Sequence, residues 1–357
     1  MKTIEIIIKN VLLKILLFFN SVKKNNSPIF LKENSKVLFI RLNKIGDALV
    51  TTPFIKLVKE NTNCHVAVLA DKKNHFVFND SKIYDEVLIL KKGFLGFIEI
   101  INRINSKKYD VVVDLHDDIS TTVSFLIALL KSKSKIGFEK DNKNIYTNTI
   151  KRPNAVSNHV VNRVMEFSKL FNVNYDIENI NIHYPICEQS ESKVNNYIKD
   201  NISENYLVGV NISAGSEARF WGVENFKNII KLLENYNLKI IILSTENERK
   251  YAEEISGGRY NVYSTTDFNE FAAMISKLNF LFTPDTSIVH LASAYKIPMF
   301  GIYVKYNTTN MIWSPFKSEF DCVITEEPNF INLKFEQVEN KFKIFFERIY
   351  EQRNTKV

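Results

Sequence analysis

The chain alternates short apolar runs with helical patterns, and it does so twice along its length. Short runs rich in β-branched and aromatic residues predict buried strands of a parallel sheet, and helices between them predict a doubly wound α/β layer. The runs are residues 36–42, 65–69, 86–90, 110–115 and 135–138 in the first half, and 206–211, 239–243, 261–263, 280–284 and 297–304 in the second. Helices are predicted between them, and Pro53 must kink the first helix or delay its start. The pattern therefore predicts two domains of one class.

A polar, Asn-rich stretch around Pro185 separates the two halves. A length of 357 residues also suits two domains better than one. The predicted organisation is an apolar N-terminal segment at 1–30, a first α/β domain at 36–175, an interdomain connection at 176–205, a second α/β domain at 206–330 and a C-terminal helix at 331–357.

Charge and cysteine usage narrow the partners and the compartment. The formal net charge of +7 favours anionic partners such as a membrane surface or a phosphorylated substrate. The lysines are dispersed and no nucleic-acid motif occurs, which disfavours nucleic acid. The three cysteines have no paired spacing, which argues against a disulfide framework and a zinc site. A reducing cytoplasm is expected.

Residues 4–19 are strongly apolar, but Glu5, Lys9 and Lys14 interrupt them. The run is shorter than the about 20 residues that a spanning helix needs. Lysines follow it in place of a small-residue cleavage site, so a signal peptide is disfavoured. The pattern favours a helix lying in the membrane interface, with lysines reaching lipid phosphates. A helix docked on the protein's own surface and a true span stay as alternatives.

Two strand-to-helix turns have chemical interest. Asp285-Thr286-Ser287 follows an apolar strand and opens an apolar helix, so a cap and free backbone N–H groups are expected where phosphate binds best. Asp47 follows the first strand, at the sheet edge where α/β folds bind ligands. It is a candidate general base, or simply a helix cap. Gly46 is the only glycine of its turn, which disfavours a dinucleotide-dependent hydride transfer.

Several further segments accompany these turns. They are Phe39-Ile40-Arg41, Ile45-Gly46-Asp47-Ala48-Leu49, Thr51-Thr52-Pro53, Asp110 to His116, Lys135-Ile136-Gly137-Phe138, Gly209 to Gly215, Arg219-Phe220-Trp221, Glu246 to Arg249 and Asp285 to His290. Their order and spacing resemble glycosyltransferase family 9, the ADP-heptose:lipopolysaccharide heptosyltransferases, over residues 37–315. The resemblance implies a GT-B architecture, in which two Rossmann-like doubly wound domains face a central cleft. The first domain would bind the acceptor and the second the nucleotide sugar, for an inverting transfer.

The resemblance also implies roles for individual residues. Asp47 matches the family's catalytic base, and Arg219 stands where the family has a lysine that neutralises the leaving diphosphate. The implied donor-binding residues are Ser213, Gly215 and Ser216 in a loop around the diphosphate, Glu248 at the ribose hydroxyls, Asp285, Thr286 and Ser287 at the helix start, and His290 within that helix. An ordinary Gly-Ser turn and a satisfied interior histidine stay open as the plainer interpretations of Ser213 to Ser216 and His290.

The chain departs from the family pattern at several positions. Ser287 replaces a glycine, Gly222 a proline, and Asp117 a glycine on the acceptor side. These departures bear on the donor more than on the fold. No Asp, Glu or His cluster has metal-ligand spacing, and no Asp-x-Asp pair stands where a donor site would need one. We therefore expect no metal and no cofactor, with the nucleotide sugar, foremost ADP-heptose, acting as a substrate.

The expected protein is a cytoplasmic glycosyltransferase, peripheral on the inner face of a bacterial inner membrane. Its expected partners are a nucleotide-sugar donor, a lipid-linked glycan acceptor of the lipopolysaccharide core type and an anionic membrane surface. Two alternatives stay open: a GT-B enzyme that uses another nucleotide sugar, and a relative that binds a nucleotide sugar without catalysis.

Overall fold

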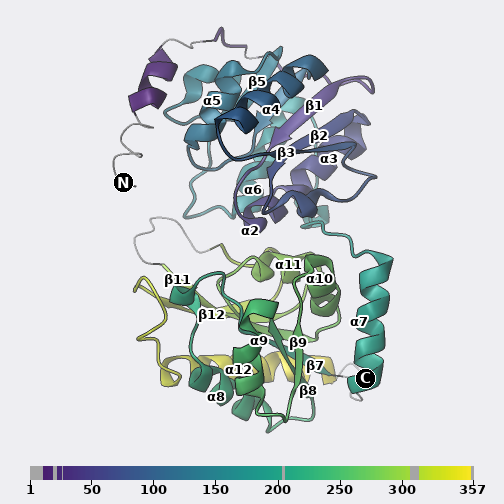
Figure 1. The fold of residues 1–357 in the computed structure, drawn as a ribbon, viewed down its shortest axis with the longest axis vertical. Coiled ribbons are helices and arrows are strands. Elements are labelled where there is room, and N and C mark those ends of the chain that lie inside the picture. Colours follow the sequence, from purple (N-terminus) through teal and green to yellow (C-terminus); the bar gives the residue numbers. More distant parts are fainter. Residues whose placement is uncertain (1–10, 19–21, 26, 203–205, 306–312, 355–357) are drawn as a thin grey trace. The chain divides into compact units, whose positions relative to one another are not determined.

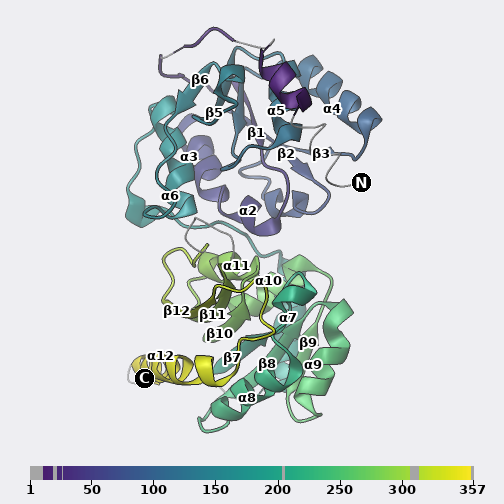
Figure 2. The ribbon, with the colours of Figure 1, turned by 90° about the vertical axis from the view of Figure 1, so that its left-hand side faces the viewer.

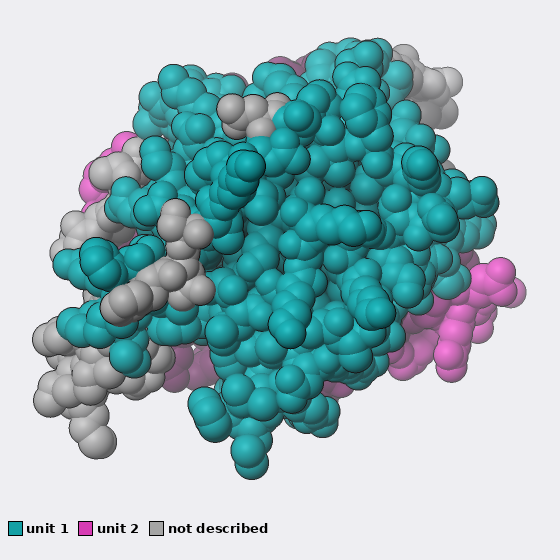
Figure 3. All heavy atoms as spheres, turned by 90° about the horizontal axis from the view of Figure 1, so that it is seen from above, with its two compact units in different colours: residues 1–183 teal, residues 184–357 magenta. Residues whose placement is uncertain are grey.

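The computed structural model describes residues 11–18, 22–25, 27–202, 206–305 and 313–354. The chain divides into two compact units, residues 1–183 and 184–357 (Figure 3). Each unit is built on one six-stranded sheet, and all neighbouring strands in both sheets are parallel. The α/β class that the alternating pattern predicts is confirmed.

The sheet of the first unit has the strand order β3-β2-β1-β4-β5-β6 (Figure 1). Its strands are β1 (Lys36–Ile40), β2 (His65–Asp71), β3 (Glu86–Leu90), β4 (Val111–Asp114), β5 (Ser134–Phe138) and β6 (Asn148–Ile150). Its α-helices are α2 (Ile45–Leu49), α3 (Thr52–Thr62), α4 (Phe94–Lys107), α5 (Thr121–Leu129) and α6 (Val160–Met165). Because successive strand residues face opposite sides, Leu38 and Ile40 pack with α4 and α5. Phe39 packs against Phe54 of α3, with ring centroids 5.8 Å apart.

The second unit repeats this topology, with the strand order β12-β11-β10-β7-β8-β9. Its strands are β7 (Leu207–Asn211), β8 (Lys239–Ser244), β9 (Asn261–Ser264), β10 (Phe280–Pro284), β11 (Met299–Val304) and β12 (Phe320–Thr325). Its α-helices are α7 (Glu188–Asn201), α8 (Val223–Leu233), α9 (Arg249–Ser256), α10 (Phe268–Ser276), α11 (Ile288–Ala294) and α12 (Glu336–Asn354). The strand order reverses between β1 and β4 in one sheet and between β7 and β10 in the other. Ligands of such sheets bind beyond the carboxyl ends of the strands at this reversal.

The final helix belongs to the second unit. Phe342 and Phe346 of α12 pack edge-on against Phe280 of β10, with ring centroids 6.2 and 5.0 Å apart. This face of the sheet also carries Phe282 and Phe300, whose rings stack in parallel planes. Burial of these aromatic side chains is a large part of the core of this unit.

Four elements are absent from the sequence-based expectation: β6, α6, α7 and β12. Helix α7 falls inside the predicted connection at 176–205 and packs on α10 of the second unit. Pro53 delays a helix, as one of the two predicted effects: α2 ends at Leu49, and α3 begins at Thr52 with the proline in its first turn, where a missing N–H costs nothing.

Part of the apolar N-terminal run is described, namely helical residues 11–18. Leu17 packs against the core cluster that α4 and α5 share with the sheet, and the helical turns lie beside these two helices (Figure 2). The rest of the apolar run, at 4–10 and 19, lies outside the described residues. Within the part of the chain that the structure describes, no helix is both long enough and apolar enough to cross a bilayer.

Candidate active site

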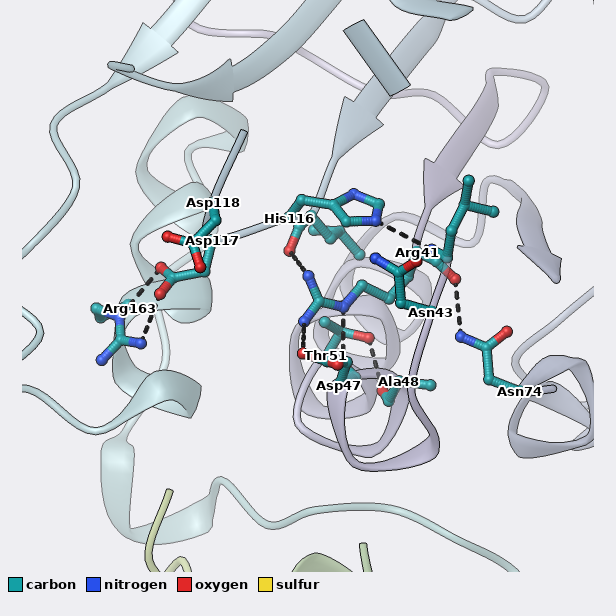
Figure 4. A network of polar contacts seen from close by, with 12 residues as sticks. Arg41, Asn43, Asp47, Ala48, Thr51, Asn74, His116, Asp117, Asp118 and Arg163 are labelled. Carbon is teal, nitrogen blue, oxygen red and sulfur yellow. Dashed lines mark hydrogen bonds and ion pairs between the residues drawn. The ribbon is translucent and has the colours of Figure 1, made fainter. Parts of the chain in front are cut away.

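An arginine holds Asp47 at the carboxyl end of β1. The Arg41 Nη2 group lies 2.6 Å from Asp47 Oδ1, and Nε donates to the Asp47 backbone oxygen at 2.9 Å (Figure 4). The third nitrogen, Nη1, donates to the carbonyl of Leu115, just beyond β4, at 2.8 Å. Arg41 is therefore tied at once to the ends of two adjacent strands and to α2. Its side chain is almost wholly buried.

The Asp47 carboxylate does not cap its helix. Lys44 is the N-cap residue of α2, and no side chain makes a cap hydrogen bond there. The capping interpretation of Asp47 is therefore wrong. Its Oδ2 atom accepts no hydrogen bond from a described residue, and the side chain is 20% exposed. One carboxylate oxygen is anchored, and the other is available to a ligand.

A buried polar cluster lies next to this pair. His116 Nδ1 lies 2.7 Å from Asp114 Oδ1, and the backbone N–H of Leu42 donates to His116 Nε2 at 3.2 Å. The hydroxyl of Tyr146 donates to Asp114 Oδ2 at 2.5 Å, and Lys140 Nζ lies 3.4 Å from the same oxygen. The loop that follows β4 is thus anchored to the loop that carries Arg41.

These contacts set the charges of the cluster. Burial alone would raise the pKa of Asp114, but the charge of Lys140 and hydrogen bonds from His116 and Tyr146 hold that pKa well below its usual value. Burial lowers the pKa of His116 against the attraction of Asp114. The ring is therefore neutral near pH 7, with its proton on Nδ1, because Nε2 accepts from a backbone N–H. Asp114 is a charged group that Lys140 balances.

Two arginines form ion pairs with Asp117, which follows β4 at the same edge of the first sheet. Arg163 donates to both carboxylate oxygens at 3.2 and 2.7 Å, and Arg152 does so at 3.0 and 2.8 Å. The cost of burial opposes ionisation, yet the two guanidinium groups lower the pKa of this carboxyl. The neighbouring Asp118 is exposed. The adjacent carboxylates thus have opposite environments, and Asp117 joins a loop to α6.

In the second unit, Glu248 is tied to the end of β7. Its Oε2 atom accepts from the hydroxyls of Ser213 and Thr245, the second at 2.5 Å. The Ser213 hydroxyl in turn accepts from the Thr245 N–H at 2.8 Å. Asn211 supports the loop by donating to the Ser213 carbonyl at 3.0 Å and to Thr283 Oγ1 at 2.9 Å. Glu248 Oε1 accepts no hydrogen bond from the described residues.

Arg219 reaches the turn that follows β10. Its Nη1 group donates to the Asp285 backbone oxygen at 3.0 Å and lies 3.1 Å from Asp285 Oδ2. The Nε and Nη2 groups make no hydrogen bond to a described residue. Helix α11 starts beyond this turn, with Ser287 at its N-cap position and no side-chain cap hydrogen bond. The side-chain cap predicted at this turn is therefore absent, and Asp285 pairs with Arg219 instead.

The remaining predicted donor residues surround these two groups. Gly215 adopts a positive φ of 68°, which suits glycine, and Ser216 starts the short turn Glu217–Arg219. Thr286 is partly buried, beside Asp285 and Ser287. His290 is buried in α11, and its ring centroid lies 6.0 Å from that of Trp313.

Comparison with known proteins decides the family. A model of glycosyltransferase family 9 (heptosyltransferase) matches residues 97–343, which is more than half of the chain. The chain belongs to glycosyltransferase family 9. It is 21% identical to the lipopolysaccharide core heptosyltransferase OpsX of Haemophilus influenzae over 316 residues, 85% of this chain and 88% of that protein.

Solved structures of the family share the fold. A glycosyl transferase family 9 protein from Veillonella parvula superimposes with a TM-score of 0.70 at 19% identity, over 83% of this chain and 88% of that one. The Escherichia coli heptosyltransferase WaaC with ADP gives 0.66 at 15% identity, over 88% and 98%. Both the resemblance to the family and the GT-B class are confirmed.

Within this family 9 chain, the structure groups some predicted residues and separates others. Ser213 and Glu248 are in direct contact, as are Arg219 and Asp285. Ser213 follows β7 and Asp285 follows β10, the two strands at the reversal, and Glu248 follows β8. Asp47 belongs to the other unit. No role for Arg41 is predicted from the sequence, although the residue lies in one of the family segments. The contact of Arg163 with Asp117 is not predicted either, because no residue spacing indicates a contact between residues 46 positions apart.

Metal-ligating side chains do not cluster in the described ranges. No group of three His, Cys, Asp or Glu residues there could hold a metal ion. Three carboxylates of the two candidate sites are paired with arginines. Asp47 and Asp117 pair with arginines in the first unit, and Asp285 pairs with Arg219 in the second.

Proposed function

We propose that this family 9 protein transfers a sugar, foremost heptose from ADP-heptose, to a lipopolysaccharide core or related phosphorylated glycolipid. The family match and the heptosyltransferases among its relatives support a glycosyl transfer. The observation that carries the proposal is the half-anchored Asp47 carboxylate, with Oδ1 on Arg41 and Oδ2 open. A carboxylate in this state can accept a proton without turning away from its substrate.

The proposed reaction is a single displacement with inversion. Asp47 Oδ2 takes the proton from an acceptor hydroxyl as that oxygen attacks the anomeric carbon. The new carbon–oxygen bond forms on one face while the bond to the diphosphate breaks on the other. The nucleoside diphosphate leaves with the bonding electrons, and its developing charge is met by Arg219 and by backbone N–H groups of the turn after β10.

The donor is proposed to bind the second unit at the β7–β10 reversal. Glu248 is held through Oε2, so Oε1 can accept from ribose hydroxyls. Arg219 is held through Nη1, so Nε and Nη2 can form a bidentate contact with a phosphate. Ser213, Gly215 and Ser216 would line the diphosphate, and Asp285 to Ser287 with His290 would close the site. Cationic stabilisation of this kind requires no metal ion.

The acceptor implies a location. A lipid-linked acceptor lies in a membrane, and we propose that the N-terminal segment 1–30 holds the protein at the anionic inner face of the bacterial inner membrane. Removing residues 1–30 would then release the protein from vesicles while leaving turnover on a soluble acceptor fragment.

The direct test is product analysis with the purified full chain. ADP-heptose and a lipopolysaccharide core acceptor should give a glycosylated product whose new anomeric centre is inverted relative to the donor. Excess EDTA should leave the rate unchanged. A product with retained configuration would reject the mechanism, and a rate restored only by a divalent ion would reject metal independence.

A different nucleotide sugar is the second candidate. Ser287 adds a side chain at the turn where the family has glycine, and Gly222 has a positive φ of 94° that proline cannot adopt. Thermal unfolding with ADP, GDP, UDP, CMP and their sugars separates the candidates, because about 2.7 kcal/mol of stabilisation is expected at a hundredfold excess over Kd. A shift with ADP supports heptose, a shift with another nucleotide changes the sugar, and no shift at all favours a non-catalytic relative.

A further inference from the structure

The first turns of α4 carry an exposed apolar tip. Phe94 is 77% exposed and Leu95 is 83% exposed, and Ile98 lies one turn further along the helix. Phe97, Ile100 and neighbouring residues of the same helix pack on the core, so the tip is the outward side of an otherwise well-packed helix. Two adjacent large apolar side chains in water are unfavourable unless another surface covers them.

Two glycines flank Phe94 and Leu95 at the start of α4. Gly93, immediately before α4, has a positive φ of 90° and makes the sharp turn that starts the helix. At Gly96, a Cβ atom would lie 2.6 Å from the carbonyl oxygen of Lys91, so this side of the helix is packed directly on the preceding loop. Gly96 is buried, whereas Phe94 and Leu95 lie on the exposed side of the same helix.

The tip has two basic neighbours, Lys91 and Lys92, and one acidic neighbour, Glu99. Residues 87–98 include Lys91 and Lys92 and no acidic residue. Lys91 pairs with Glu99 at 3.0 Å, an exposed contact that is worth little in water. Lys92 is exposed and forms no ion pair with any described residue. An aromatic and a leucine side chain beside lysines match the boundary between acyl chains and anionic headgroups of a bilayer.

The tip is also on the same side of the sheet as the N-terminal helical turns. Leu17 packs against the cluster that contains Ile100 and Ile104 of α4, and the outward residues Val11, Leu12 and Ile15 are apolar and exposed. We propose that the α4 tip, Phe94, Leu95 and Ile98 with Lys91 and Lys92, is a second membrane-docking point that acts together with residues 11–18 on an anionic bilayer. The inference rests on the proposed membrane location of the protein and on the proposed role of its N-terminal segment there.

A second copy of the chain fits the tip less well. A stable protein interface buries about 800 Å² on each partner. Three side chains, each of roughly 200 Å² or less, supply well under that area. A bilayer needs no complementary surface, since insertion of a few side chains combines with the attraction of lysines to lipid phosphates.

The test is partition of the full-length protein onto vesicles of phosphatidylethanolamine and phosphatidylglycerol in a 3:1 ratio. Phe94→Ser/Leu95→Ser should weaken partition about tenfold, since two inserted side chains are lost. The matched control is Ile331→Ser/Ile344→Ser, which removes two apolar side chains that are 81% and 61% exposed on the second unit. Its partition should equal that of the natural protein. Lys91→Gln/Lys92→Gln should reduce the dependence of binding on salt.

Other outcomes overturn the proposal. Equal partition of the Phe94/Leu95 variant and the natural protein would remove the tip from membrane binding. A natural protein that dimerises without lipid, with the variant monomeric, would make the tip a protein interface. Turnover on a soluble acceptor fragment should be unaffected in every variant, so lost turnover with normal partition would count against the proposed reaction and not against the docking surface. Slower amide exchange at 94–98 on vesicles would mark direct contact.

Discussion

The two units hold the same ion pair in opposite ways. In the first unit the arginine is the fixed partner: Arg41 is nearly buried and makes three hydrogen bonds, and Asp47 presents one open oxygen. In the second unit the arginine is the more exposed partner: Arg219 is tied by Nη1 to Asp285 and presents its other two nitrogens. Each pair follows a strand at the reversal of its sheet. In each pair the anchored residue, Arg41 or Asp285, orients its partner. The partner, Asp47 or Arg219, has free polar atoms that can contact a substrate.

The family match assigns no role to the anchoring residues, whereas their contacts give each of them one. An acceptor hydroxyl needs an oriented base, and a leaving diphosphate needs an oriented cation. On this account Arg41 and Asp285 are positioning residues, and Asp47 and Arg219 are the proposed catalytic ones. Removing an anchoring residue should impair only the function of its own unit, which is acceptor activation for Arg41 and donor binding for Asp285.

Among the anchoring residues, the largest effect is expected for Arg41→Met. Three acceptors lose their donor, and Asp47 loses its counter-charge, so we expect about 3 kcal/mol of lost stability and a rate reduced by at least about a hundredfold. Chemical denaturation and steady-state kinetics measure both. Arg41→Lys keeps the charge without the forked geometry and should fold while losing about tenfold in rate. The control is Arg103→Met, which breaks an exposed pair with Glu86. An active Arg41→Met enzyme would show that Asp47 needs no anchor.

Asp285→Asn should have an intermediate effect. The amide keeps the shape of the side chain but removes the charge that orients Arg219, so kcat/KM should fall about tenfold with weaker ADP binding. Calorimetric titration with ADP measures the binding. Glu319→Gln breaks an exposed pair with Arg348 in the same unit and should change neither quantity. Unchanged affinity in Asp285→Asn would mean that Arg219 is oriented without its carboxylate.

Stability should depend on pH through the buried cluster of the first unit. His116 has a lowered pKa in the folded state, so below its unfolded value of about 6.5 the unfolded chain binds more protons and stability falls with falling pH. Asp114 adds a further loss below about pH 4, since its folded pKa is lowered as well. His116→Gln should flatten the curve near pH 6, by up to about 1.4 kcal/mol per pH unit. Denaturation at several pH values tests this, and an unchanged slope near pH 6 would mean that His116 is not buried as a neutral ring.

The smallest effect is expected for Glu248→Gln. The amide can keep the contacts of Oε2 with Ser213 and Thr245 but presents a neutral group to the ribose, so donor affinity should fall only about three- to tenfold with little change in kcat. Nucleotide titration measures it. A large fall in kcat with unchanged affinity would place Glu248 in the chemistry instead.

The sequence predicts the fold well because its signals are local. Apolar runs of β-formers mark the central strands, and nearly all strands of both sheets appear within a few residues of their expected positions. The missed elements lack that signal. Helix α7 is charged and Asn-rich and buries only Ser190 and Val194, and β12 is a half-exposed edge strand. Pro53 was expected to kink the helix or to delay its start, and its place in the first turn of α3 is the second of these effects.

The site was less accessible from sequence. Asp47 is a candidate base from its position after the first strand, and Arg219 from the family resemblance, but the residues that anchor them are set by the fold. Arg41 lies six residues from Asp47 and Asp285 lies 66 residues from Arg219, and neither spacing is a motif. The pairing of Lys140 with Asp114 and the contacts of Arg152 and Arg163 with Asp117 likewise join segments that the fold brings together. Such contacts depend on strand order, which residue patterns do not specify.

The central claim is that the two pairs divide the reaction between acceptor activation and donor binding. The most direct measurement compares Asp47→Asn and Arg219→Met for turnover of ADP-heptose and for affinity of ADP, with Asp141→Asn as an exposed control in the first unit. We predict that Asp47→Asn loses about a thousandfold in turnover with ADP affinity unchanged, and that Arg219→Met loses both. Full turnover in Asp47→Asn, or unchanged ADP affinity in Arg219→Met, would contradict the account.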